Sequence, residues 1–352
     1  MSSMHQLSPE ESAVFFEHRF RFAGRGHPAV EAMFDLAMEW IPAQNVTVPA
    51  VTAVPDPSAP AVPSALSAAA LPPAPDPVDI VQMEVRLPPM PAVLLELQEI
   101  IHRPDVSATA IADVIAKDPG LAAWLLKLVN SPYYGFSAKV ATISRAVTLV
   151  GTRQIQILSM GGALNSLAVL LPKGLMDMDR FWQHSMATGI AAQEIWRLTG
   201  RAEGEQLFVA GLLHDCGKLA MVYAAPKISQ FLRSSPNFSS KPSYLAEKEY
   251  LGFDHARLGG MLMHRWNMPL PLVIAILRHH DVEDPGRYPE AACVHVANIL
   301  VTALGLTLDE GTPVPTLNHA AWDVLGLAPQ KLAFVAGTLR TRLESLLSTV
   351  QG

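Results

Sequence analysis

The chain has 352 residues, half of them hydrophobic, and a formal net charge of −6 at pH 7. This length and apolar content suffice to bury one large core or two smaller ones, so we expect a globular protein. Lysines and arginines are mixed with acidic residues and form no basic face, which argues against nucleic acid as a partner. Only Cys216 and Cys293 occur. Two cysteines predict no disulfide framework and favour a reducing, cytoplasmic compartment.

The sequence predicts no membrane partner. Its first residues lack a basic and then apolar leader. We find no run of roughly 18 uncharged apolar residues, the length that spans a bilayer.

Two short helices are predicted at the N-terminus. Ser8, Pro9 and Glu11 match an N-cap, a first-turn proline and a capping-box acid, so a helix should run from there to about residue 22 and stop at Gly24. Pro28 opens a second helix with apolar residues at helical spacing. We expect this hairpin to dock on the main body or on another protein, because a free hairpin would expose too much apolar surface. The side chains expected to be buried are Phe15, Phe16, Phe20, Phe34 and Trp40.

Residues 41–80 differ in composition from the rest of the chain. They contain ten prolines and ten alanines, and no lysine, arginine or glycine. Such a segment buries too little surface to fold, and its prolines favour a semi-extended spacer. We therefore divide the chain into an N-terminal helical segment (1–40), a disordered Pro/Ala-rich linker (41–80) and a main domain (81–350).

The main domain is predicted to be helical from the spacing of its apolar residues. Asp118 and Pro119 supply an N-cap and a first-turn proline. The buried stripe of that helix is expected to be Leu121, Trp124, Leu125, Leu128 and Val129. Further helices are expected over 106–117, 143–149 and 154–171. Alternating runs of strand length are scarce, so the fold class is all-α, a bundle whose halves span about 81–172 and 173–350.

An adjacent histidine and aspartate end an apolar run at residues 212–218. His214 and Asp215 form a metal-ligand arrangement if further ligands lie close by. The candidate partners are His184, His255, His279 and His280. Imidazole and carboxylate together suit divalent ions such as Zn, Fe, Mn or Ni, with Mg a further candidate, and two ions could share such a set.

Several blocks in this order resemble the HDOD domain, an HD-related helical signalling module. In the first half they lie at residues 87–91, 118–121, 126–134, 143–147 and 149–151. In the second half they lie at 182–185, 213–218, 255–259, 266–269 and 279–280. The resemblance covers about residues 85–300. It implies a multi-helix HDOD or HD-like bundle that acts in signal transduction through protein partners.

The HDOD domain is also similar to HD and HD-GYP phosphohydrolases, in which matching residues bind one or two metal ions that activate water against a phosphate ester. The resemblance implies that the metal ligands are His184, His214, Asp215, His255, His279 and His280. It also implies catalytic roles for Asp215, which could bridge two ions, and for Lys218. If the helix continues through the pair, Lys218 would lie on the same face as His214 and could meet a phosphate.

Two departures oppose an intact enzyme. Asn298 stands where HD enzymes carry their last aspartate, and a neutral amide is a weaker ligand. The segment after the histidine doublet has Arg287 between glycine and tyrosine, so the Gly-Tyr-Pro signature is absent. Asp254, Glu249 or Asp281 could replace the missing acid.

Two hypotheses about function therefore stay open. The preferred one is a non-catalytic or weakly catalytic signalling module, and the alternative is a metal-dependent phosphohydrolase acting on a nucleotide or cyclic nucleotide. Each histidine alone also has a structural interpretation. His184 could bond a carbonyl, His255 and His264 could be half-buried surface residues, and helical spacing would turn one of His279 and His280 about 100° away from the other.

Overall fold

The computed structural model describes residues 9–43, 76, 92–101, 103, 106–131, 134–168, 171, 174–201, 204–235, 240–309 and 311–351. All regular elements among these residues are helices, which confirms the predicted all-α class. The N-terminal hairpin consists of α1 (Pro9–Phe20) and α2 (Pro28–Ala43). The first half of the main domain contains α4 (Ala92–Ile101), α5 (Ala108–Ile115), α6 (Pro119–Val129), α7 (Ile143–Val150) and α8 (Thr152–Ala168).

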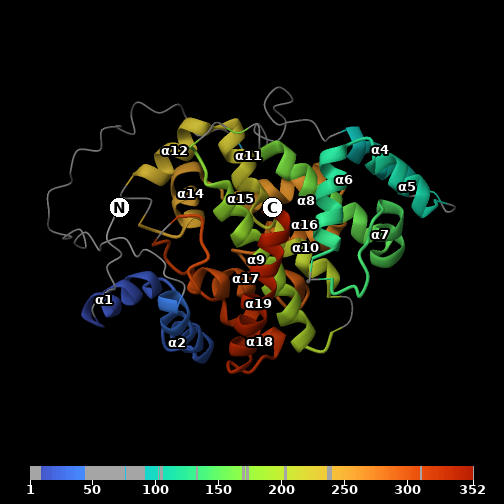
Figure 1. Cartoon of the computed structure of the whole chain (residues 1–352). Coiled ribbons are helices and arrows are strands. Elements are labelled where there is room, and N and C mark those ends of the chain that lie inside the picture. The colour runs from blue at the N-terminus through green and yellow to red at the C-terminus, as the bar shows by residue number, and fades with distance from the viewer. Residues whose placement is uncertain are drawn as a thin grey trace, which may run out of the picture.

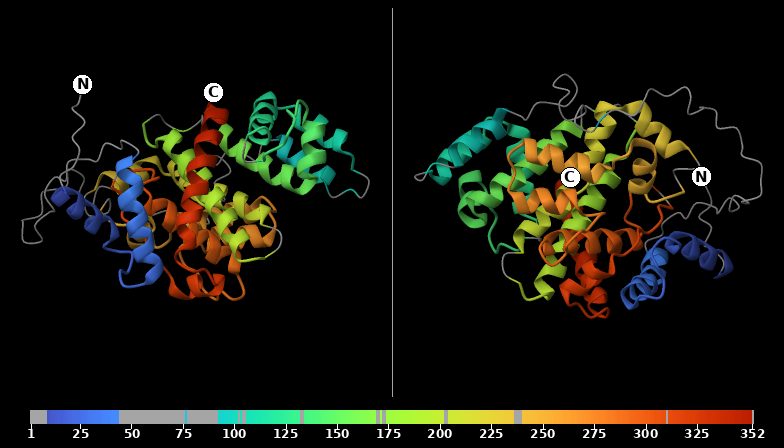
Figure 2. Two further views of the ribbon diagram at one scale, coloured as in Figure 1. Left: turned by 60° about the horizontal axis from the view of Figure 1, so that its bottom comes forward. Right: turned by 180° about the vertical axis from the view of Figure 1, so that it is seen from behind.

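The second half forms the centre of the molecule. Its helices are α9 (Met178–Leu198), α10 (Glu205–Leu213), α11 (Cys216–Ala224), α12 (Pro226–Ser234), α14 (Ser243–Leu251), α15 (His255–Arg265), α16 (Leu270–Leu277), α17 (Pro289–Ala303), α18 (His319–Leu325) and α19 (Lys331–Gln351). Helix α9 packs against α10, α17 and α19. Figures 1 and 2 show the N-terminal hairpin and the first half on opposite flanks of this centre.

Local sequence signals set the helix boundaries as predicted. The Asp118 side chain accepts a hydrogen bond from the Leu121 backbone N–H at 3.0 Å, and Pro119 occupies the first turn of α6. The predicted apolar stripe of α6 is buried. Helices α5, α7 and α8 begin and end within a few residues of the predicted ranges.

The N-terminal hairpin docks on the main body. Phe15, Phe16, Phe20 and Trp40 are buried as expected, and Phe34 is partly buried. Helix α2 packs against α17 and α19. Helix α2 extends to residue 43, and most of the segment predicted to be a linker lies outside the described residues.

One stretch is apolar enough to cross a membrane, which the sequence analysis did not anticipate. Gln206–Ala224, covering α10 and α11, has a mean hydropathy of 1.3 over 19 residues. However, 89% of this stretch is buried inside the structure, and it includes His214, Asp215 and Lys218. Such burial is typical of a core helix in a folded body.

Two close helix crossings determine where the polar residues of the second half lie. A Cβ atom on Gly211 of α10 would lie 2.6 Å from Gly189 Cα of α9, so these backbones touch. A Cβ on Gly217 of α11 would lie 1.9 Å from the His255 carbonyl oxygen at the start of α15. These glycines allow α10 and α11 to approach their neighbours more closely than any larger residue would permit.

We therefore predict that Gly217→Ala destabilises the protein by about 1–3 kcal/mol, because α15 must move away from α11. Gly337→Ala is the matched control, since Gly337 lies in α19 with no heavy atom within 4 Å of an added Cβ. Alanine there should leave stability unchanged or raise it by up to about 1 kcal/mol. Denaturant unfolding measures both changes, and equal stability of the two variants would contradict the close approach.

Candidate metal centre

The His-Asp pair lies in a break between two helices. Helix α10 ends at Leu213 and α11 begins at Cys216, so His214 and Asp215 occupy the turn between them. The prediction of one helix face carrying His214 and Lys218 is therefore wrong. Instead, Lys218 Nζ lies 2.8 Å from Asp215 Oδ2 and forms an ion pair with it.

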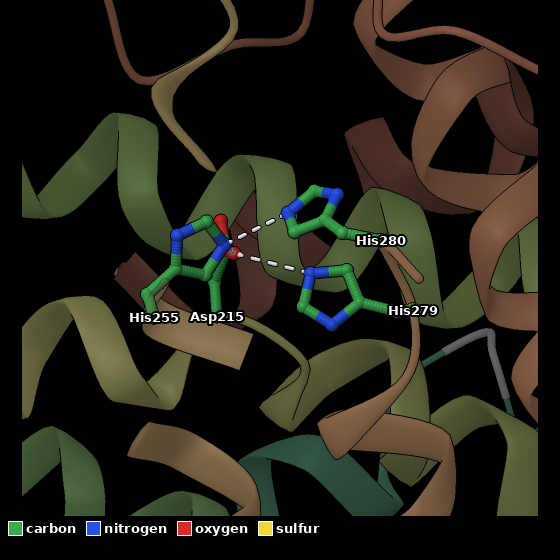
Figure 3. Close-up of side chains that lie close together, drawn as sticks. All are labelled: Asp215, His255, His279 and His280. Carbon is green, nitrogen blue, oxygen red and sulfur yellow. Dashed lines mark hydrogen bonds and ion pairs between the residues drawn. The ribbon is translucent and has the colours of Figure 1, made fainter. Parts of the chain in front are cut away.

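The other candidate ligands come from three further places in the chain. His184 lies on α9, and His255 is the first residue of α15. His279 and His280 follow the end of α16 in a bend, so the helical geometry that would separate them does not apply. Both rings face the same cluster (Figure 3).

All six predicted ligands come together in two groups that share Asp215. In the first ligand group, His184, His214 and Asp215, the two imidazole Nε2 atoms are 3.2 Å apart. The second ligand group is Asp215, His255, His279 and His280. There, His255 Nε2 lies 2.9 Å from Asp215 Oδ1 and 3.0 Å from His280 Nε2 (Figure 3). Within each group all ligand atoms lie within 4.8 Å of one another.

Backbone carbonyls orient three of the histidines so that their Nε2 atoms face inward. The Nδ1–H groups of His184, His214 and His279 donate to carbonyl oxygens at 2.6 to 2.7 Å, those of Leu306, Gly211 and Ile276 respectively. A neutral imidazole that donates through Nδ1 has a lone pair on Nε2. The lone pairs of His184 and His214 thus face each other. A cation between such atoms would stabilise them, and the fixed tautomers are typical of metal-bound histidines.

His279 gives an independent indication that the cluster needs a further binding partner, such as a metal ion. Its Nε2 atom is buried and has no hydrogen-bond partner among the described residues. A buried acceptor without a partner costs roughly 1–3 kcal/mol. Coordination of a metal ion would satisfy it, so the residues present fit the metal that the pattern predicts.

Sequence reasoning missed Glu247, which orients His255. The Glu247 carboxylate is buried and accepts hydrogen bonds from His255 Nδ1 at 2.6 Å and from the His255 backbone N–H at 2.7 Å. A carboxylate behind a metal-binding histidine fixes the ring and raises its basicity. Glu247 lies on α14, eight residues before His255. Helix α14 ends at Leu251, between the two residues, so no helical spacing in the sequence could have indicated the contact.

None of the acids proposed to replace the missing aspartate belongs to either ligand group. Asp254 caps α15 by accepting from the Arg257 backbone N–H at 2.9 Å. Glu249 is exposed and pairs with Lys241. The Asp281 side chain is 70% exposed and pairs with Lys248.

Burial and charge set the protonation states of the cluster. Burial lowers the pKa of His214 to about 3 and lowers the pKa of His184, and burial with neighbouring imidazoles keeps those of His279 and His280 well below the usual range. Burial alone would raise the pKa of Asp215, but nearby cationic groups hold it well below its usual range. The cluster therefore presents neutral imidazoles and an ionised carboxylate, as metal binding requires.

His255 is the exception. Burial alone would lower its pKa, but Glu247 and Asp215 raise it to about 9. Without a metal the ring is therefore a cation at neutral pH. It donates through Nδ1 to Glu247 and forms an ion pair with Asp215, whose Oδ1 atom lies 2.9 Å from its Nε2 atom.

A cavity of about 520 Å³ reaches the cluster. At the cluster it is lined by His184, Lys218, Glu247, His280 and Asn298. Asn298 is buried in α17, and its Oδ1 atom accepts a hydrogen bond from Thr302 Oγ1 at 3.4 Å. Asn298, which the resemblance places where HD enzymes carry their last aspartate, therefore lines the same cavity as His184.

Residues 87–282 match the HDOD domain. The chain belongs to the HDOD family. Among curated proteins, an uncharacterized protein of Treponema pallidum (strain Nichols) is 29% identical over 265 residues, which cover 74% of this chain and 50% of the relative. This chain therefore spans about half the length of that relative.

Solved structures agree on the fold. An HDOD domain protein with unknown function from Geobacter sulfurreducens is 23% identical, with a TM-score of 0.60. A protein of Shewanella amazonensis SB2B, described as a candidate phosphohydrolase, has the same identity and TM-score. Each comparison covers 78% of this chain and 97% of the other. At this identity the likeness shows the HDOD helical fold alone.

We predict that Glu247→Gln weakens metal binding by about 10- to 100-fold, because the amide orients His255 less well and lowers its basicity. Glu249→Gln on the same helix is the matched control and should bind metal like the wild type. Competition with a zinc chelator measures both affinities. Equal affinities in the two variants would exclude a role for Glu247 behind the metal ligand.

Metal affinity should rise with pH. His255 has a pKa of about 9 and is protonated at pH 7, so an ion that binds Nε2 must displace a proton. The apparent affinity should increase by about tenfold per pH unit from pH 7 to 9 and level off above. Chelator competition at several pH values tests this, and a flat profile would show that His255 does not bind the ion.

Proposed function

We propose that this HDOD chain is a cytoplasmic, metal-binding signalling module that acts through protein partners and has little or no hydrolytic activity. The convergence of imidazole lone pairs on the ionised Asp215 carries the metal-binding part of the proposal. The signalling part rests on membership of the HDOD family.

The second ligand group should bind its ion more tightly than the first. It offers three imidazoles and one carboxylate, a set that suits Zn, Fe, Mn or Ni better than Mg, which prefers oxygen ligands. The first ligand group offers two imidazoles and the shared Asp215, and the neutral Asn298 lines the same cavity as His184. With one imidazole fewer and a neutral amide in place of an acid, this group should have a lower affinity for a second ion.

The weaker metal binding expected at the first ligand group also argues against efficient hydrolysis. A second ion polarises the substrate and stabilises the charge that develops during phosphate transfer. With Asn298 beside the first ligand group, and with no replacement acid in the part of the chain that the structure describes, that ion would bind weakly. The chain would then retain the residue arrangement of a hydrolase site but would lack a tightly bound second ion.

Phosphate-ester hydrolysis is the second candidate, and the cavity favours it. The cavity opens onto the ligand groups, and Lys218 lines it with its amine 2.8 Å from Asp215. A metal that neutralises Asp215 would leave Lys218 free to bind a phosphate. The volume of about 520 Å³ lies in the range of small-molecule sites.

Asn298→Asp separates the two candidates. The added carboxylate should raise the affinity of the first ligand group, so elemental analysis should find more metal per chain than in the wild type. With added Mn, slow hydrolysis of bis(p-nitrophenyl) phosphate should appear in Asn298→Asp only. Asn267→Asp adds the same charge at an exposed position outside the cluster. It should change neither the metal content nor the rate of hydrolysis. Wild-type turnover of cyclic dinucleotides on the order of 1 per second or faster would contradict the signalling proposal.

A further inference from the structure

The N-terminal hairpin contacts two parts of the chain that border the cavity. The first is the α17–α18 loop, which the structure describes over residues 304–309 and 311–318. It contributes Thr307, Leu308, Asp309, Thr312, Pro313 and Pro315 to the cavity lining. The second is the segment before α14, where Lys241 and Pro242 line the cavity next to Ser240. Residues in or next to both parts form hydrogen bonds with α1 or with the residues that follow it.

Main-chain and side-chain hydrogen bonds attach the hairpin to the α17–α18 loop. The Val314 backbone N–H donates to the Arg19 carbonyl at 2.7 Å, and Thr316 Oγ1 donates to the Phe22 carbonyl at 2.6 Å. The Arg19 guanidinium donates to the Thr302 carbonyl at the end of α17. On the other side, the Arg21 guanidinium donates to the Ser240 carbonyl.

The α17–α18 loop also orients a candidate metal ligand. The Leu306 carbonyl accepts the hydrogen bond from His184 Nδ1 that directs the Nε2 atom of this ring toward His214. Thr302, which the hairpin contacts through Arg19, donates to Asn298 in the same cavity. A displacement of the loop would therefore change the orientation of His184 and the surroundings of Asn298.

Docking of the hairpin buries a charged side chain that is incompletely hydrogen-bonded, which costs free energy. The Arg19 side chain is only 2% exposed, and its Nε–H has no hydrogen-bond partner among the described residues. A buried cation that is incompletely bonded opposes docking. The cost of burying Arg19 offsets part of the stabilisation from the apolar contacts of the hairpin. The docked and released states therefore differ less in free energy than those contacts alone would give.

From these contacts we infer that the hairpin is a regulatory strap: when docked it keeps the α17–α18 loop and His184 in position for metal binding, and its release weakens the first ligand group. This inference rests on the proposed metal centre. Because coupling between two sites is reciprocal, a bound ion should in turn favour the docked hairpin. A partner that binds the apolar face of the released hairpin would thereby lower metal occupancy.

Two substitutions of the same residue type on α2 test the coupling. The Met33 side chain of α2 is fully buried and that of Met38 is 40% exposed. Met33→Glu should release the hairpin, seen as faster deuterium exchange over residues 9–43. It should also lower the affinity for the weaker-bound zinc ion, the one that the first ligand group would hold, by about tenfold, within the range typical of coupled sites. Met38→Glu should match the wild type in both measurements. A released hairpin with wild-type zinc affinity would overturn the inference.

The wild-type chain provides a second measurement that needs no variant. Saturating zinc, which should also fill the first ligand group, should slow deuterium exchange over residues 9–43, and this result decides the matter even if Met33→Glu fails to fold or stays docked. Unchanged exchange in a chain saturated with zinc would refute the strap while leaving the second ligand group intact. A wild-type chain that binds no zinc would refute the metal centre itself.

Discussion

The ionised carboxylate of Asp215, buried at 1% exposure among histidine rings, is the constraint on which the second half of the protein depends. An uncompensated charge in such a place would cost several kcal/mol, so positive partners must surround it. In the metal-free chain these are Lys218 and protonated His255. The remaining imidazoles are neutral and present lone pairs, and a divalent cation would satisfy them together with the carboxylate.

Close helix crossings keep these groups together. Glycines at the crossings of α9 with α10 and of α11 with α15 let backbones touch, which fixes His184, the His-Asp turn and His255 relative to one another. All the ligands and all the cavity-lining residues belong to the second half of the main domain. No described residue of α4 to α8 lines the cavity or belongs to either ligand group.

The sequence predicted the helices well, and also the residues that come together in the cluster, where the signal is local. The cap at Asp118, the stripe of α6 and the adjacency of His214 and Asp215 are all features of short segments. Predictions failed where they assumed that a helix continues: the chain breaks at His214 and again before His279, so helical spacing misplaced their neighbours. Glu247 was missed because only tertiary packing places α14 beside the start of α15. The docking of the hairpin on the α17–α18 loop is likewise a long-range contact that no local pattern indicates.

Anomalous X-ray diffraction from crystals of the zinc-loaded chain tests the metal centre most directly. We predict a peak at the zinc edge within about 2.0–2.3 Å of the Nε2 atoms of His255, His279 and His280 and of an Asp215 oxygen. A weaker peak is expected between His184 and His214, because this ligand group has one imidazole fewer. Crystals grown with saturating zinc that show no anomalous peak at Asp215 would contradict the account.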